Sequence, residues 1–212
     1  MKIVSVNVGQ PQALMVKDGV VLSSIVKRSV EGPVMVRRTN LEGDAQADLA
    51  VHGGERKAVY AYSSEYYPLW KQELGDIELP FGSFGENLTT EGMFDQDVYL
   101  GDHYQVGSAV LTVTQPRTPC FKLNARFVRD DMGQRMIATR RYGFYLSVAQ
   151  EGLVQAGDEI RLLERAPLPV SVAQMMDLYL GRSDDPALIE RAMSLETLGS
   201  KWKNKLIQRA GT

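Results

Sequence analysis

Cysteine is nearly absent from this sequence, since Cys120 is the only one among 212 residues. A single thiol cannot form an internal disulfide, and by itself it cannot build a zinc site or an iron–sulfur cluster. The chain also has no Cys-x-x-Cys-His motif for haem, and no Gly-x-Gly-x-x-Gly run after a predicted strand to mark a flavin or nicotinamide domain. We therefore expect no iron–sulfur cluster and no flavin in this chain.

Long apolar runs and an excess of basic charge are missing as well. No apolar stretch approaches the ~20 residues that a membrane-spanning helix needs, and residues 1–7 lack the apolar core of a signal peptide. The net charge of −2 argues against a protein that binds nucleic-acid polymers, because neutralising phosphates requires a basic face. With its single cysteine, the chain is expected to be cytoplasmic and to have no membrane partner.

Short apolar runs separated by turn signals fill the first 165 residues. Asp18-Gly19, placed between two apolar runs, is a strong signal for a β-hairpin. Two helices are predicted in this part. The first is capped by Ser63 or Ser64 and runs toward Leu74, and the second spans residues 126–139 with a break near Gly133. The many short strands indicate a mostly β protein with some α, and we predict an antiparallel β-barrel for residues 1–165.

The pattern becomes helical after a proline-rich linker. Ser171 can cap a first helix together with the glutamine three residues later. Asp185-Pro186 is suited to begin a second helix, and a third is predicted from Ser194. Because short helices cannot bury much surface alone, we expect residues 170–212 to form a small C-terminal helical bundle that packs on the barrel.

Cys120 lies in the run Pro-Arg-Thr-Pro-Cys-Phe-Lys at residues 116–122. The two prolines restrict the backbone, while Arg117 and Lys122 place cations beside the thiol, which favours the thiolate. A thiolate held in this way suits a nucleophile, or a single protein ligand to a metal that brings its other ligands with it. A buried structural cysteine is the alternative, since free cysteine is among the most buried residue types.

A second candidate segment is the loop at residues 81–87, which contains two glycines. Glycines let the backbone approach a ligand closely and turn its N–H groups outward. The loop can therefore cradle an anion, with Gly85 in the turn, or present Glu86 and Asn87 to a heterocycle rich in N–H donors. A plain connection with glycine turns is the alternative.

Other candidates are scattered along the chain. His52 can act as a general acid, or can hold its loop through a hydrogen bond, whereas His103 is not expected to join it in a metal site. Arg141 suits bidentate binding of phosphate, although an arginine pair in a turn is usually solvated. Tyr60 and Tyr62 alternate on one predicted strand, so both should face the same side, as core or as the wall of a pocket.

Three motifs, in their order and spacing, resemble the MOSC family, in its stand-alone YiiM-type branch. They are His-Gly-Gly at residues 52–54, Phe-Gly-Glu-Asn-Leu at residues 84–88 and the proline–cysteine–lysine run at residues 116–122. The resemblance implies a β-barrel that holds the molybdenum cofactor, a molybdopterin whose dithiolene supplies two sulfurs to the metal. Cys120 is then the protein's ligand to molybdenum, and the cofactor-binding candidates are Arg117, Lys122, Arg141, Gly85, Glu86, Asn87 and Tyr62.

The activity that the resemblance implies is the reduction of N-hydroxylated compounds, such as hydroxylaminopurines, to the amine and water. Cys120 and His52 are the catalytic candidates, with His52 as a source of protons. Two alternatives stay open. Cys120 could carry sulfur as a persulfide, although no pyridoxal-phosphate (PLP) domain accompanies it here, or the protein could bind and carry the cofactor without catalysis.

Reducing an N–OH bond consumes two electrons, so the metal must be recharged after each turnover. Because the chain has no redox motif of its own, we expect a separate flavoprotein reductase as the electron donor. The last predicted helix carries Lys201, Lys203, Lys205 and Arg209, a basic segment suited to an acidic partner. A solvated helix face is the alternative reading of these residues. The oligomeric state is not predicted.

Overall fold

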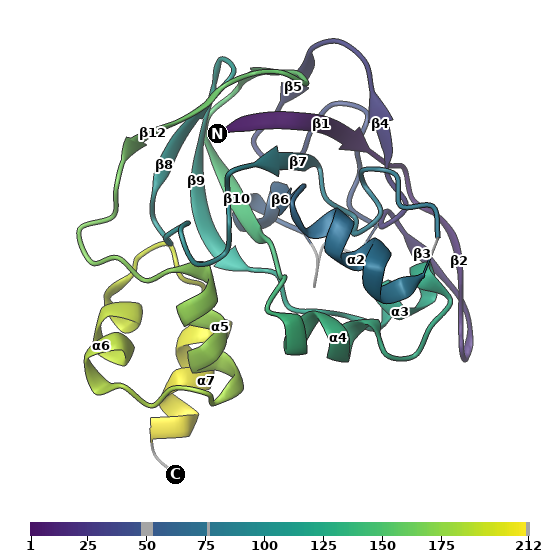
Figure 1. The fold of residues 1–212 in the computed structure, drawn as a ribbon. Helices are drawn as coiled ribbons and strands as arrows, with labels where there is room; N and C mark the ends of the chain where they lie inside the picture. The colour runs from purple at the N-terminus through teal and green to yellow at the C-terminus, as the bar shows by residue number, and fades with distance from the viewer. Residues whose placement is uncertain (48–52, 76, 211–212) are drawn as a thin grey trace.

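The largest element of the structure is a sheet of eight strands, in the order β12-β8-β9-β10-β6-β7-β1-β4. The computed structural model describes residues 1–47, 53–75 and 77–210 (Figure 1). The strands of this sheet are β1 (Lys2–Val8), β4 (Arg28–Val30), β6 (Val59–Ser63), β7 (Leu88–Glu91), β8 (His103–Val106), β9 (Ala109–Pro116), β10 (Phe144–Gln150) and β12 (Ile160–Glu164). Two small sheets join β2 (Gln12–Val16) to β3 (Gly19–Ser23), and β5 (Val34–Val36) to β11 (Gly152–Val154).

The sheet does not close, so the predicted antiparallel barrel is not confirmed. Its edge strands, β12 and β4, do not pair with each other. The chain entering β12 reaches β1 instead, where Ile3 N donates to Asp158 O across 2.9 Å and Ile160 N donates to Met1 O across 2.8 Å. In addition, β6 and β7 pair in parallel, because the connection between them carries a helix that crosses over the sheet. The protein is therefore a mixed α/β structure with a large open sheet.

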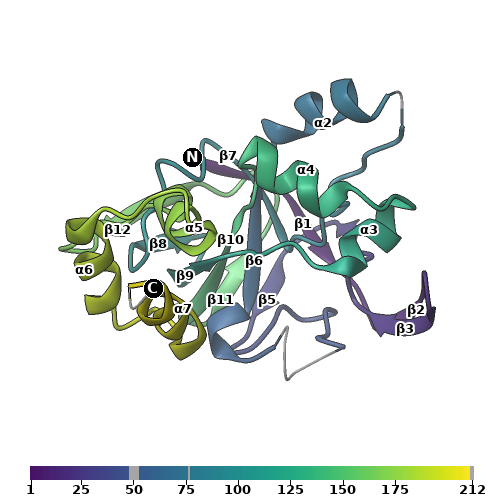
Figure 2. The same ribbon diagram turned by 90° about the horizontal axis from the view of Figure 1, so that it is seen from below.

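Six α-helices lie in the described part of the chain: α2 (Tyr66–Leu74), α3 (Phe121–Phe127), α4 (Met132–Thr139), α5 (Val172–Leu180), α6 (Pro186–Ser194) and α7 (Ser200–Ala210). The short 3-10 helix η1 (Glu55–Lys57) precedes β6. In Figures 1 and 2 the three last helices gather beside β8 and β9, while the β2–β3 hairpin projects on the other side of the molecule. Among the described helices, none has both the length and the apolar character needed to cross a bilayer.

The hairpin predicted at Asp18-Gly19 is confirmed, and the helical segment predicted at residues 126–139, with a break near Gly133, is confirmed in part. Two helices occupy the segment from 121 to 139, and the break lies before Gly133 rather than at it. Val128 adopts a left-handed conformation with φ of 51°, and its N–H donates to Ala125 O across 3.2 Å, which ends α3. Glycine composition alone did not indicate this turn, since the residue that makes it is a valine.

The helical tail begins as the sequence predicts. Ser171 and Gln174 form a capping box at the start of α5, and Asp185 caps α6 through Ala187 N. The third helix starts at Ser200 rather than at Ser194, because α6 itself extends to Ser194. Leu195, Leu198, Trp202 and Leu206 are all buried. These apolar side chains join the same hydrophobic core as the sheet.

Candidate functional site

Five of the predicted site residues line one cavity, which is about 100 Å³ in volume: Gly85, Asn87, Arg117, Cys120 and Lys122. This space is several times the roughly 10–15 Å³ that one water molecule needs. Segments that are distant in sequence meet at this cavity. Two strands, β6 and β10, contribute wall residues, as do the C-terminal ends of β3 and β9 and the loops that follow β5 and precede β7. The cavity is therefore a product of the tertiary fold.

Cys120 occupies the N-cap position of α3 and lines the cavity. Its backbone is extended, with φ of −131° and ψ of 162°, and its carbonyl accepts a hydrogen bond from Leu123 N across 3.0 Å. The residue is half-buried and forms no disulfide. Strand β9 ends at Pro116, and residues 117–119 lead from the sheet to Cys120, whose side chain lines the cavity.

Arg117 is the most deeply buried of the predicted cations, at 5% exposure. Its guanidinium lies over the ring of Tyr60, with Cζ 5.1 Å from the ring centroid, and Nη1 lies 3.5 Å from Met136 Sδ. Burial opposes its charge, but attraction to Tyr60, Cys120 and Tyr145 outweighs burial and raises the pKa of Arg117. Within the described residues, no carboxylate forms an ion pair with it. A permanently charged group in this position attracts an anionic ligand.

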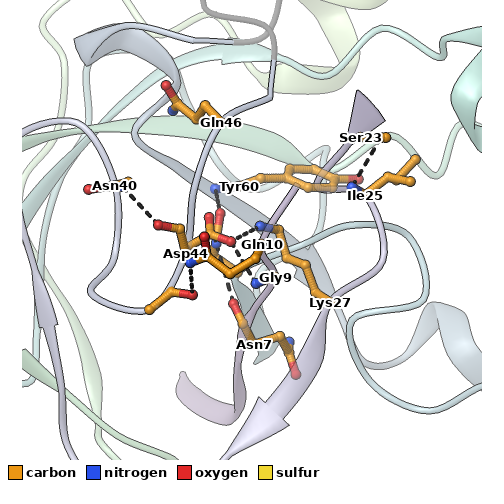
Figure 3. Close-up of polar contacts among 12 residues, drawn as sticks. Asn7, Gly9, Gln10, Ser23, Ile25, Lys27, Asn40, Asp44, Gln46 and Tyr60 are labelled. Atoms are coloured by element: carbon orange, nitrogen blue, oxygen red, sulfur yellow. Dashed lines mark hydrogen bonds and ion pairs between the residues drawn. The ribbon is translucent and has the colours of Figure 1, made fainter. Parts of the chain in front are cut away.

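Lys27 and Asp44 form a buried ion pair in the same cavity, with side-chain exposures of 7% and 4%. Asp44 also accepts a hydrogen bond from Gly9 N across 2.8 Å (Figure 3). A further hydrogen bond, from Asn87 Nδ2, reaches Asp44 across 2.8 Å. Burial lowers the pKa of Lys27, and the attraction of Asp44 opposes this shift only in part. Lys27 was not among the residues predicted for the site. Its one signal is a lysine directly after the apolar pair Ile25-Val26, which is a weak one.

The loop before β7 closes one side of the cavity. Asn87 is 4% exposed, and its Oδ1 accepts a hydrogen bond from Tyr60 N across 3.1 Å. Gly85 has φ of +82°, and a Cβ added to it would lie 2.9 Å from Cγ1 of Ile25. Glycine is therefore required at this position, both by the backbone conformation and by the close approach to the neighbouring wall. This agrees with the turn expected from the sequence.

Glu86 faces away from this lining and holds the loop instead. Its side chain is fully buried and accepts hydrogen bonds from Gly82 N across 2.8 Å and from Phe84 N across 3.1 Å. It also accepts from the hydroxyl groups of Tyr67 and Thr89. Burial raises the pKa of Glu86, and these donors oppose the shift. With its acceptor oxygens occupied by its own chain, Glu86 does not present itself to a ligand as predicted.

Two further predicted residues lie outside the cavity lining. Arg141 forms an ion pair with Glu73 across 2.8 Å and lies over the ring of Trp70, with Cζ 4.9 Å from the centroid. Tyr62 is fully buried, and its hydroxyl accepts a hydrogen bond from Trp70 Nε1 across 2.6 Å. Both side chains are thus used in packing around α2. Although Tyr60 and Tyr62 share a strand face, only Tyr60 reaches the cavity.

Of the two histidines, only His103 lies in the part of the chain that the structure describes. His52 lies outside the described residues. His103 lies on β8, where Nδ1 is 3.0 Å from Thr112 Oγ1 on the neighbouring strand, so it belongs to the sheet. In residues 1–47, 53–75 and 77–210, no group of three or more His, Cys, Asp or Glu side chains could hold a metal ion.

The charges that line the cavity have one dominant sign. Four basic side chains, Lys27, Lys57, Arg117 and Lys122, face a single described carboxylate, Asp44. The rings of Tyr60 and Tyr145 form an apolar wall, with centroids 5.3 Å apart. Burial raises the pKa of Tyr145, while the charge of Arg117 lowers it, and the net shift is upward. An anionic ligand with a planar apolar part matches this lining, and Cys120 adds a soft sulfur donor.

Comparisons with known proteins match both parts of the chain. Residues 48–161 match the MOSC domain, and residues 170–209 match the YiiM-like, 3-alpha helix domain. The uncharacterized protein YflK of Bacillus subtilis is 36% identical over 207 residues, which are 98% of this chain and 93% of YflK. A protein named "Reductase" from Gibberella moniliformis is 41% identical over 158 residues, which are 71% of this chain and 27% of that one. The crystal structure of YiiM from Geobacillus stearothermophilus has a TM-score of 0.81 at 33% identity, with 98% of each chain covered.

Proposed function

Because this chain belongs to the MOSC family and carries the YiiM-like three-helix domain, we propose that it is a molybdenum-cofactor-dependent reductase of N-hydroxylated compounds. The overall reaction takes R–NH–OH, two electrons and two protons to R–NH2 and water. Hydroxylaminopurines are the substrate class that we propose. The observation that carries this proposal is the meeting of Cys120, Arg117 and Lys122 in one cavity.

The residues of the cavity fit the molybdenum cofactor. The cofactor is an anion through its dithiolene and its phosphate, and the lining is rich in cations. It brings two sulfur ligands to the metal, so the single cysteine is sufficient as a protein ligand. Arg117 and Lys122, at 5% and 8% exposure, would hold the negative groups. When bound, the cofactor supplies a metal centre that changes its oxidation state by two electrons.

The chain's own residues then have separate tasks. Sγ of Cys120 would hold the metal of the cofactor, while Tyr60 and Tyr145 would keep water from one side of the cavity. Nζ of Lys27 holds a proton next to Asp44, and its lowered pKa makes that proton easier to release than the proton of an exposed lysine. We therefore propose Lys27 as a proton donor of the cavity, beside the earlier candidate His52. A metal-binding thiol must stay reduced, which suits a cytoplasmic enzyme.

The electrons come from another protein in this proposal. One relative bears the name "Reductase", and the matched region is only 27% of that longer chain. For the present chain we propose a separate flavoprotein reductase that reduces the metal between turnovers. A basic surface on α7 could attract such a partner, but Arg209 is already engaged, since it forms an ion pair with Asp184 across 2.7 Å.

The proposal is tested with protein purified from a host that makes the cofactor. Reduced methyl viologen replaces the reductase, and 6-hydroxylaminopurine is the substrate. We expect adenine to form at a rate that depends on the molybdenum content. Cofactor-loaded protein that forms no adenine would contradict the reductase and leave a cofactor carrier. A persulfide on Cys120 in metal-free protein, detected by mass spectrometry, would favour the sulfur carrier instead.

A further inference from the structure

A second hollow lies between the helical tail and the sheet. It has a volume of about 140 Å³, and its walls include Lys57, Gln115 and Thr118 on one side and Tyr179, Lys201 and Trp202 on the other. A wider cleft of about 510 Å³ lies along α7. Tyr179, Ser200 and Lys201 line both of these spaces, so the two adjoin, and we call them together the tail cleft.

The tail cleft adjoins the catalytic cavity. Lys57 lines both spaces, which places them on two sides of one side chain. Thr118, in the wall of the cleft, precedes Cys120 by two residues, so their Cα atoms are at most about 7 Å apart. Figure 2 shows α7 beside the end of β9, and Arg56 of η1 donates to Thr197 O across 3.2 Å to fix this side of the tail. The tail cleft therefore lies next to the cavity of Cys120, on the other side of Lys57.

The lining of the tail cleft is cationic, with an aromatic floor. Lys57, Lys201 and Lys205 line it, and no carboxylate appears among its described lining residues. The half-buried ring of Tyr179 packs on Trp202, with centroids 4.8 Å apart, and offers a surface for a sugar or a base. Lys203 lies on the same helix but lines neither space. The lysines of α7 therefore divide into two that face the cleft and one that does not.

From this geometry, and resting on the proposed reductase, we infer that the preferred substrate is a nucleotide whose base is N-hydroxylated. Its phosphate binds Lys201 and Lys205 in the tail cleft, and its ring extends past Lys57 so that the N–OH group meets the site of Cys120. The phosphate undergoes no chemistry and serves only to anchor the substrate. The helical tail is then part of the substrate site, and its cleft-facing lysines distinguish the nucleotide from the free base.

Binding measured by calorimetry tests this inference without any turnover. Adenosine 5′-monophosphate and adenine, the products of the two substrate forms, are titrated into the wild-type protein and into Lys201→Ala and Lys203→Ala. We expect the monophosphate to bind at least tenfold more tightly than adenine, and Lys201→Ala to remove most of that difference, as the loss of a charge-assisted contact does. Lys203→Ala should bind like the wild type. Equal binding of the two ligands, or equal losses in both variants, would overturn the inference.

Kinetics with reduced methyl viologen separate substrate binding from partner docking. Lys201→Ala should raise KM roughly tenfold for the hydroxylaminopurine nucleotide, with kcat unchanged and with no effect on the free base. An equal loss with both substrates would contradict the phosphate site, as would a loss of molybdenum from the variant. If the wild type reduces neither compound, the reductase proposal fails, while the calorimetry still decides whether the cleft binds the phosphate.

Discussion

The side-chain amide of Asn87 donates a hydrogen bond to Oδ2 of Asp44 across 2.8 Å, although the two residues are 43 positions apart. This bond joins the loop before β7 to the loop after β5, and it holds Asp44 where it pairs with Lys27. Oδ1 of the same amide accepts from Tyr60 N across 3.1 Å. Asn87 therefore connects three walls of the cavity from a fully enclosed position.

We predict that Asn87→Ala destabilises the protein by roughly 2–4 kcal/mol, because buried groups of Asp44 and Tyr60 lose their partner at once. Thermal unfolding of the variant and the wild type measures this change. Gln10→Ala is a suitable control, since Gln10 is exposed and donates to Gly43 O in the neighbouring loop across 2.8 Å. A variant at position 87 that unfolds at the same temperature as this control would contradict the role given to Asn87.

Arg117 and Arg141 are predicted to differ in their effect on the cofactor. Arg117→Ala should weaken cofactor retention by roughly one to two decades, because it removes the buried charge of the cavity. Arg141→Ala should lower stability through its lost pair with Glu73, yet keep the cofactor per folded chain. Pterin fluorescence of the released cofactor, divided by the amount of folded protein, gives the comparison. Equal retention in the two variants would show that the cavity lining does not hold the anion.

Asp95 is predicted to make stability depend on pH. It is 2% exposed and accepts hydrogen bonds from Tyr66 Oη across 2.6 Å and from Gly143 N across 2.9 Å, and burial raises its pKa to about 7. The folded pKa lies above the unfolded value, so this contribution to stability is complete below about pH 4 and is lost as the pH rises through 7. We expect the melting temperature of the wild type to fall from pH 5 to pH 8.5, and Asp95→Asn to reduce this fall.

The exposed Asp97 provides the control for this pH dependence. Asp97→Asn changes the same charge two residues away and should leave the slope of melting temperature against pH as it is in the wild type. If Asp95→Asn and Asp97→Asn have the same slope, the buried carboxyl is not the titrating group. Asp95 is connected to the site through Gly143. The N–H of Gly143 donates to Asp95, and its carbonyl accepts a hydrogen bond from Arg117 N across 3.1 Å.

Local signals in the sequence were sufficient for several parts of this structure. Asp18-Gly19 predicted the β2–β3 hairpin, and Ser171 with Gln174 predicted the capping box of α5, because both features depend on a few adjacent residues. The proximity of Cys120, Arg117 and Lys122 could also be predicted, since only four residues separate the two cations along the chain. Features fixed by short stretches of chain could thus be predicted.

Features that depend on long-range packing could not be predicted in this way. The pairing of Lys27 with Asp44 joins loops 17 residues apart, and the open order of the sheet depends on which strands meet across the whole fold. Glu86 resembled a ligand in its glycine-rich loop, but burial and four internal donors turned it into a structural acceptor. The left-handed turn at Val128 likewise has no signal in its residue type.

The most direct measurement is the molybdenum content of the wild type and of Cys120→Ser, both purified from the same molybdate-replete host that makes the cofactor. Serine keeps the shape of the side chain and removes the soft sulfur donor. Inductively coupled plasma mass spectrometry gives the metal, and fluorescence of the oxidised pterin gives the cofactor. The account predicts molybdenum in the wild type and its loss from Cys120→Ser, with pterin retained in part through Arg117 and Lys122. Equal molybdenum in both proteins would contradict the assignment of Cys120 as the ligand on which the account rests.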